Sequence, residues 1–133
     1  MNQVFSFPYK RFSTDFYPII DIFIKSRREI IQTEAFVDSG ASTSIFRIAI
    51  AEKLGIDYAK GARGFTLVGD GSYIQVYYHK LHIQIGKIWV KTTVSFSPQL
   101  GADMNLIGQK DIFDHFDITF SKHKGIVSFR PHY

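Results

Sequence analysis

The sequence predicts a mainly β domain, folded as a closed or partly closed barrel, and three observations carry that prediction. Aromatic residues are abundant, with 13 Phe and 7 Tyr among 133 residues, and together with many Ile and Val they favour strands. Apolar and polar residues alternate in several short stretches, as in half-buried strands. Only two short segments have helical spacing. Periodicity alone does not say which barrel the strands build.

The strands are expected as three hairpins. Residues 16–24 and 28–37 form the first, with a turn at Lys25-Ser26-Arg27. The clearest alternation covers 80–85 and resumes over 88–96, so Gly86-Lys87 is expected to be a two-residue hairpin turn. Ile118 and Phe120, followed by residues 126–129, predict a closing hairpin across Lys124-Gly125.

Two helices are expected between these hairpins. The first covers about 44–54, where Phe46, Ile50 and Leu54 lie four residues apart and share one face. The cluster Ser42-Thr43-Ser44 offers an N-cap, and Gly55 is a suitable stop. The second covers about 109–115.

Composition restricts the classes of function. The length fits one domain over residues 1–133. The chain has no Cys, which excludes disulfides, thiolate metal sites and a cysteine nucleophile. No secretory signal and no apolar run of roughly 18 residues is found, so a cytoplasmic protein without a membrane partner is expected. The net charge is +4, but the basic residues are scattered, which favours a solvated surface over a nucleic-acid site.

One motif places a carboxylate in a distinctive position. The apolar stretch Ala35-Phe36-Val37 leads directly into Asp38-Ser39-Gly40-Ala41. Gly40 permits a tight backbone path, Ser39 supplies a hydroxyl beside the acid, and Ala41 leaves room. Taken alone, this tetrapeptide is more often a structural turn than a catalytic one.

Segments later in the chain favour the catalytic interpretation of residues 38–41 over a structural turn. Asn105-Leu106-Ile107-Gly108 opens the second helical segment, and residues 65–74 carry glycines at the tip of a possible hairpin between the two motifs. In this order, the motifs resemble those of the retropepsin-like aspartic protease family. Residues 41–56 and 108–120 are also similar to segments of prokaryotic and retroelement members, and the resemblance covers roughly 21–129. It implies a closed β-barrel of the acid protease fold with two short helices, a β-hairpin flap and a homodimer.

The resemblance also implies a mechanism. Because the chain has one copy of the motif, the two required carboxylates would be the Asp38 side chains of two subunits, which share a proton. One Asp38 would activate water and the protonated one would polarise the scissile carbonyl of a peptide, with no metal or other cofactor. Ser39 would lock the two loops together, and Gly40 would present its carbonyl to the peptide. The other implied site residues are Ala41 in the active-site loop, the flap residues Val68, Gly69, Asp70, Gly71 and Ser72, and the supporting residues Leu106, Ile107 and Gly108.

Some positions depart from the viral members and leave alternatives open. Ser42 and Thr43 follow the first motif and Gln109 follows Gly108, so the acid–arginine pair that would brace the dimer is missing. One alternative is therefore a module that dimerises or binds peptide without cutting. Another is a basic, aromatic-rich barrel that binds nucleic acid. Residues 4–9 and 129–133 could supply interface strands. His79 and His82 point to opposite faces of a strand, so no shared metal is expected.

Overall fold

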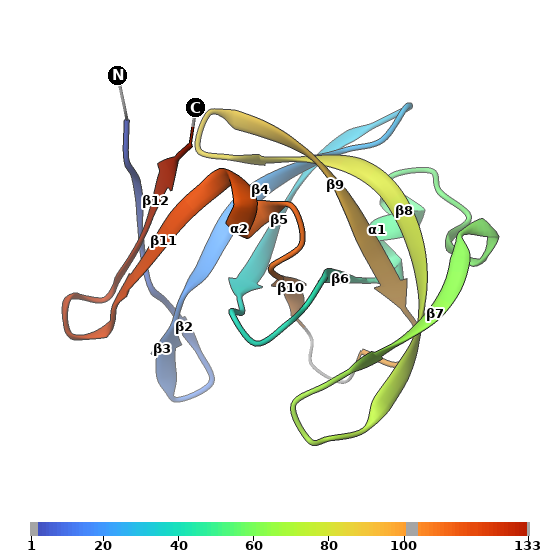
Figure 1. Ribbon diagram of the computed structural model, residues 1–133, viewed down its shortest axis with the longest axis horizontal. Helices are drawn as coiled ribbons and strands as arrows, with labels where there is room; N and C mark the ends of the chain where they lie inside the picture. The colour runs from blue at the N-terminus through green and yellow to red at the C-terminus, as the bar shows by residue number, and fades with distance from the viewer. Residues whose placement is uncertain (1–2, 101–103, 133) are drawn as a thin grey trace.

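The computed structural model describes residues 3–100 and 104–132. Its main sheet has seven strands in the order β4-β5-β10-β6-β9-β8-β7. Figure 1 shows that this sheet is strongly curved, with β8 as its longest strand. The strand bounds are β4 (Ile19–Lys25), β5 (Ile30–Val37), β6 (Ser44–Arg47), β7 (Ala62–Leu67), β8 (Tyr73–Ile85), β9 (Ile88–Ser97) and β10 (Asn105–Ile107).

Strand β8 has three strand neighbours. It pairs antiparallel with β9 and β7, and it also pairs with β4 at the other end of the sheet order. The sheet therefore curves until its first strand meets β8. The side chains that face inward are mostly Ile, Val and Phe, and Ile24, Ile83 and Phe96 are fully buried. The mainly β class is confirmed, and the closure of the barrel stays a prediction.

A second, three-stranded sheet joins the two ends of the described chain in the order β1-β12-β11. In Figure 1 the N- and C-terminal ends lie together at the upper left. Phe5 pairs with Phe129, so the strands considered for the dimer interface pair with each other inside one chain. A two-stranded hairpin, β2-β3, lies beside this sheet. The bounds are β1 (Phe5–Pro8), β2 (Lys10–Phe12), β3 (Asp15–Tyr17), β11 (Phe116–Ser121) and β12 (Ile126–Pro131).

The helices are shorter than the sequence predicted. Residues 44–47 form β6, and α1 covers only Ile48–Lys53. The Ser42–Ser44 cap is therefore wrong, because Arg47 is at the N-cap and no side chain caps the helix. The stop at Gly55 is correct in position, since Gly55 has a φ of 71°. Helix α2 covers Ile112–His115, three residues later than expected at its start.

The strand predictions differ mainly at their ends. Expected strand 16–24 is divided at Pro18 into β3 and β4, and the next strand begins at Ile30 because the chain turns at Ser26, whose N–H donates to the Glu29 carbonyl at 2.9 Å. The hairpin at Gly86 is confirmed, with Ile85 opposite Ile88. The closing hairpin contains η2 (Lys122–Lys124), and η1 (Tyr58–Lys60) precedes β7. No helix among the described residues is long and apolar enough to span a membrane.

Candidate active site

Asp38 follows the last residue of β5, where the strand is most enclosed. Val37 is 1% exposed, and β5 has β4 on one side and β10 on the other. The Val37 N–H donates to the Pro18 carbonyl at 2.8 Å, and the Asp38 N–H donates to the Ile107 carbonyl at 2.9 Å. The backbone that leads to the carboxylate is therefore fixed from both sides before the turn begins.

The turn after β5 is closed by the carboxylate itself. Asp38 Oδ1 accepts a hydrogen bond from the Gly40 N–H at 2.9 Å, and the Asp38 carbonyl accepts one from the Ala41 N–H at 3.2 Å. A Cβ at Gly40 would lie 3.2 Å from Asp38 Oδ1, so a larger residue would press on the carboxylate. Asp38 is half-buried, whereas Ser39 and Gly40 are exposed. The turn therefore holds one carboxylate oxygen and presents the acid toward solvent.

The short strand β10 lies beside this turn. It lies between β5, to which it is parallel, and β6, to which it is antiparallel. Ile107 is opposite Val37, which places the end of β10 beside Asp38. Leu106 is half-buried and Ile107 is fully buried. The end of β10 therefore lies beside the Asp38 turn, and the role of residues 106–108 in supporting an active site stays a prediction.

Asn105, at the start of β10, links three strands through its side-chain amide. Its Oδ1 accepts the Arg47 N–H at 3.0 Å. Its Nδ2 donates to the Glu34 carbonyl at 2.9 Å and to the Thr33 hydroxyl at 3.2 Å. Asn105 is 1% exposed, so these bonds satisfy a polar side chain that would otherwise be costly to bury.

Gly108 allows β10 to meet the chain after the Asp38 turn. A Cβ at Gly108 would lie 2.3 Å from the Thr43 carbonyl oxygen, closer than any side chain can approach. The Gly108 N–H donates to the Ser44 hydroxyl at 3.0 Å, and Ser44 is fully buried. Glycine is therefore required here because any side chain would clash with the backbone at Thr43.

Gln109 continues this contact along the loop that follows Asp38. Its N–H donates to the Ala41 carbonyl at 2.8 Å, and its side-chain Nε2 donates to the Ser39 carbonyl. The Lys110 N–H then donates to the Ser42 carbonyl at 2.9 Å. From the sequence, Gln109 was only a departure from viral members, Asn105 had no role of its own, and Ser44 was expected in a helix N-cap, whereas its hydroxyl accepts the Gly108 N–H. The Asn that precedes Leu106-Ile107-Gly108 was the available signal for a buried amide.

The expected flap is a hairpin formed by β7, the beginning of β8 and a turn over residues 68–72. The Val68 N–H donates to the Ser72 carbonyl at 2.9 Å, and Gly71 has a φ of 86°, which favours glycine. Three large apolar side chains are strongly exposed along the hairpin: Phe65, Leu67 and Tyr73. In Figure 1 the tip of this hairpin lies at the bottom of the view, and the turn between β5 and β6 lies above it, near the middle.

Asp70 organises the tip of this hairpin. Its Oδ1 accepts the Ser72 N–H at 2.9 Å and the Ser72 hydroxyl at 2.5 Å. The hydroxyl bond, with help from the N–H, lowers the pKa of Asp70 below its ordinary value. Within the described residues, no hydrogen bond joins the flap tip to the Asp38 turn. The structure therefore groups residues 38–41 with 106–108, and it places the expected flap residues 68–72 on a separate hairpin.

No group of three or more His, Asp or Glu side chains within the described part of the chain could hold a metal ion. The chemistry that the described turn offers is that of one carboxylate held by the Gly40 N–H.

Comparison with known proteins agrees with this geometry. The model of a family described as "gag-polyprotein putative aspartyl protease" matches residues 29–112. The chain belongs to this family of retropepsin-like aspartic proteases. No curated protein matches the sequence.

Two solved structures show the same fold. A retropepsin-like aspartic protease from Rickettsia conorii superposes with a TM-score of 0.65 at 20% identity, covering 98% of this chain and 94% of the other. The EIAV protease complexed with the inhibitor HBY-793 gives a TM-score of 0.54 at 18% identity, covering 75% of this chain and 88% of the other.

Proposed function

We propose that this chain is an aspartic endopeptidase whose active site forms when two copies bring their Asp38 side chains together. The observation that carries the proposal is the position of Asp38. Its backbone is fixed by Ile107, one carboxylate oxygen is held by Gly40, and the residue is only half-buried. A rigid carboxylate at the surface can approach its counterpart across a two-fold axis.

The reaction needs the two carboxylates to carry one proton between them, because two close negative charges repel each other. The ionised Asp38 takes a proton from water while the oxygen of that water bonds to the scissile carbonyl carbon. The protonated Asp38 of the partner subunit gives its proton to the carbonyl oxygen. The tetrahedral intermediate then collapses: the C–N bond breaks, the leaving nitrogen takes the proton that the first Asp38 received from water, and one hydroxyl of the intermediate returns its proton to the partner's Asp38 as the carboxyl group of the product forms.

Residues 68–72 would cover the bound peptide in this proposal. A hairpin joined to the sheet at one end can open for substrate and close to exclude water. A Cβ added at Gly69 would have no atom within 4 Å, so this part of the tip is open to a ligand or a partner. Ser39 and Gly40 would contact the partner loop and the peptide backbone, respectively.

The alternative of a module that does not cut rests on the missing acid–arginine pair. Gln109 occupies the position after Gly108 and bonds to the Ser39 and Ala41 carbonyls. The active-site loop is thus braced within its own chain by an uncharged side chain, which favours the catalytic proposal over this alternative.

The first test compares Asp38→Asn with Asp114→Asn, an exposed carboxylate with no side-chain hydrogen bond among the described residues. Cleavage of a protein substrate is measured across acidic and neutral pH. Asp38→Asn should reduce cleavage by about a thousandfold or more, because the proton relay is lost. Asp114→Asn should cleave like the wild type. Equal cleavage by both variants would reject the catalytic assignment.

The second test concerns assembly. Specific activity should fall on dilution, in parallel with the dimer fraction from analytical ultracentrifugation. Mixing wild-type protein with excess Asp38→Asn chain should inhibit cleavage, because mixed pairs contain only one ionisable Asp38. Activity that is independent of both concentration and the variant would contradict the shared site.

A further inference from the structure

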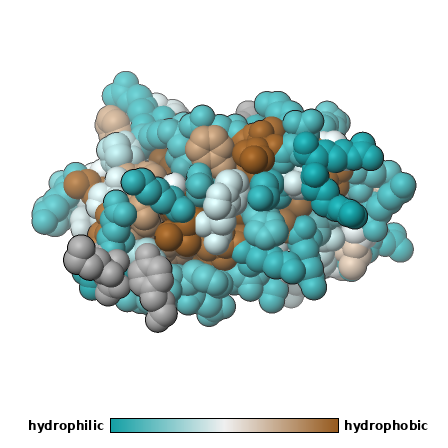
Figure 2. Space-filling model, turned by 90° about the horizontal axis from the view of Figure 1, so that it is seen from above, coloured by the Kyte–Doolittle hydropathy of each residue, from teal (hydrophilic) through white to brown (hydrophobic). Residues whose placement is uncertain are grey.

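One pocket among the described residues lies away from Asp38. It has a volume of about 680 Å³ and is lined by three segments: the β4–β5 turn, the end of α1 and part of β8. In Figure 1 the β4–β5 turn lies at the upper right, whereas the turn between β5 and β6 lies at the other end of β5, near the middle of the view. The molecule seen from above in Figure 2 has strongly hydrophilic residues gathered toward the same right-hand end.

Strand β8 has an unpaired edge in this pocket. On the side away from β9, β7 pairs with β8 as far as Tyr78, and β4 pairs with it from His82 onward. Residues 79–81 pair with β9 alone within the described chain. Since backbone groups of a strand point alternately to its two sides, this gap leaves N–H and C=O groups facing the pocket.

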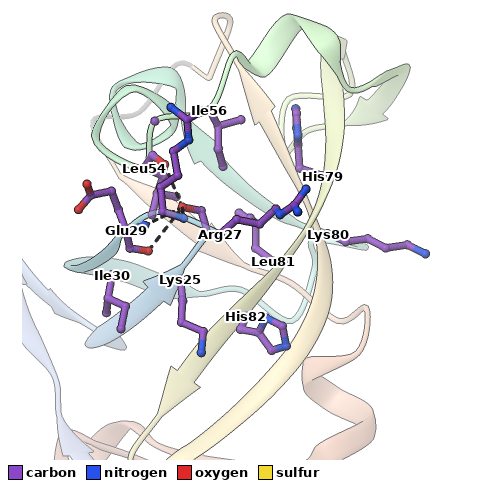
Figure 3. A pocket seen from close by; sticks show the side chains of 13 residues that line it. Lys25, Arg27, Glu29, Ile30, Leu54, Ile56, His79, Lys80, Leu81 and His82 are labelled. Atoms are coloured by element: carbon purple, nitrogen blue, oxygen red, sulfur yellow. Dashed lines mark hydrogen bonds between the residues drawn. The ribbon is translucent and has the colours of Figure 1, made fainter.

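The pocket is strongly basic. Its lining includes Lys25, Arg27, Arg28 and Lys80, against one acidic residue, Glu29. None of these four cations forms a salt bridge with a described carboxylate. Figure 3 shows Arg27 extending across the pocket toward β8, while Glu29 points to the opposite side. Lys25 and His82 are directly opposite each other on paired strands.

The pocket also has an apolar part. Leu54 is fully buried, Leu81 is 6% exposed, and Ile30 is 56% exposed at the edge. Ile56 adds a half-buried aliphatic side chain. Apart from two His rings, the lining has no aromatic side chain, so it lacks the Phe, Tyr or Trp surfaces on which nucleic-acid bases stack.

We propose that this pocket binds an extended, acidic segment of a partner protein that carries an aliphatic side chain. The segment adds its backbone to the unpaired edge at residues 79–81, as peptides do at exposed sheet edges. Its carboxylates face Arg27, Arg28 and Lys80, and its aliphatic side chain lies against the accessible side chains of Ile30 and Ile56. The site is separate from Asp38, so binding here does not depend on the catalytic proposal.

The test uses a fluorescein-labelled peptide of alternating Glu and Leu residues and measures binding by fluorescence anisotropy at low and physiological salt. The protein is the Asp38→Asn chain, which cannot cut the peptide in the proposed mechanism. A peptide of alternating Lys and Leu controls for charge, and labelled oligouridine controls for nucleic acid. The acidic peptide should bind more tightly than both, with an affinity that weakens as salt rises.

Reversing the charge of two pocket residues tests whether the acidic peptide binds at this pocket. Arg27→Glu/Arg28→Glu should weaken acidic-peptide binding by about tenfold or more, because two exposed cations become repulsive. Lys122→Glu/Lys124→Glu makes the same charge change at η2, on exposed positions outside the pocket, and should leave binding within about twofold. Circular dichroism checks that both variants fold.

Three results would overturn the proposal: no binding of the acidic peptide at low salt, equal loss of binding in both double variants, or tighter binding of oligouridine than of the peptide. Equal loss would indicate a response to overall charge. Tighter binding of oligouridine would assign the basic surface to nucleic acid.

Discussion

The N–H of Asp38 donates a 2.9 Å hydrogen bond to the carbonyl of Ile107. The residue proposed for catalysis is thereby held by a strand that comes much later in the chain. Gly108 and Gln109 follow Ile107 and continue the contact along the loop after Asp38. Changes in residues 105–109 should consequently affect the Asp38 turn even though none of them carries the carboxylate that is proposed to react.

Gly108→Ala should be strongly destabilising. The added Cβ would lie 2.3 Å from the Thr43 carbonyl oxygen, so two backbone segments would have to separate. We expect a loss of about 1–3 kcal/mol in the free energy of unfolding, as for other overpacked sites. Urea denaturation measures it. Gly69→Ala is the matched control, because a Cβ there has nothing within 4 Å; a similar loss in both variants would rule out the steric explanation.

Asn105→Leu should also reduce stability. The substitution keeps similar volume but leaves the Arg47 N–H and the Glu34 carbonyl without their side-chain partner. A cost of about 2–4 kcal/mol is expected for unsatisfied buried groups, measured as a shift in the urea midpoint. Gln84→Leu, on a half-buried position without a side-chain hydrogen bond in the described chain, should change stability far less. An unchanged midpoint for Asn105→Leu would contradict the proposed link between strands.

Gln109→Leu should separate activity from stability. Gln109 is exposed, so losing its bond to the Ser39 carbonyl should cost less than about 1 kcal/mol of folding free energy. The loop that carries Asp38 would nonetheless lose its brace, and kcat/KM should fall by about tenfold. Gln32→Leu, an exposed position on β5, is the control. If kcat/KM is unchanged in Gln109→Leu, the brace is not needed for the reaction.

The turn over residues 68–72 should respond to acid. The Ser72 hydroxyl and N–H lower the pKa of Asp70 in the folded state. A lowered carboxyl pKa contributes stability above the unfolded value, about 3.9, and this contribution is lost as pH falls through the folded pKa. Ser72→Ala should therefore raise the pKa of Asp70 toward its ordinary value in an NMR titration. Ser42→Ala, at an exposed position outside the flap, should not change it; a shift in that control, or none in Ser72→Ala, would exclude the hydroxyl as the cause.

Local patterns in the sequence predicted the parts of the fold that depend on neighbouring residues. The hairpin at Gly86 follows from alternation on both sides of a turn, and all of its information lies within one short segment. The Asp38 motif was found because an apolar strand leads directly into a tight turn. In both cases the local preference agrees with the tertiary structure.

Strand β6 could not be predicted in this way. Ser44, Ile45 and Phe46 are all buried, so the segment has no alternation, and the spacing of Phe46, Ile50 and Leu54 equally suits a helix. Its conformation is determined by pairing with β9 and β10, which are distant in sequence. The role of Gln109 could not be predicted either, because its hydrogen-bond partner, the Ser39 carbonyl, is distant in sequence.

The insertion of β10 between β5 and β6 also has a kinetic consequence. Strands β5 and β6 are close in sequence, but the strand that separates them comes only after β7, β8 and β9. The carbonyl of Ile107 can hold Asp38 only when this late strand enters the sheet, and contacts between distant segments form slowly. The active-site turn should therefore be among the last parts of the molecule to acquire its native geometry, and a growing chain that has not yet reached β10 would carry Asp38 without its support.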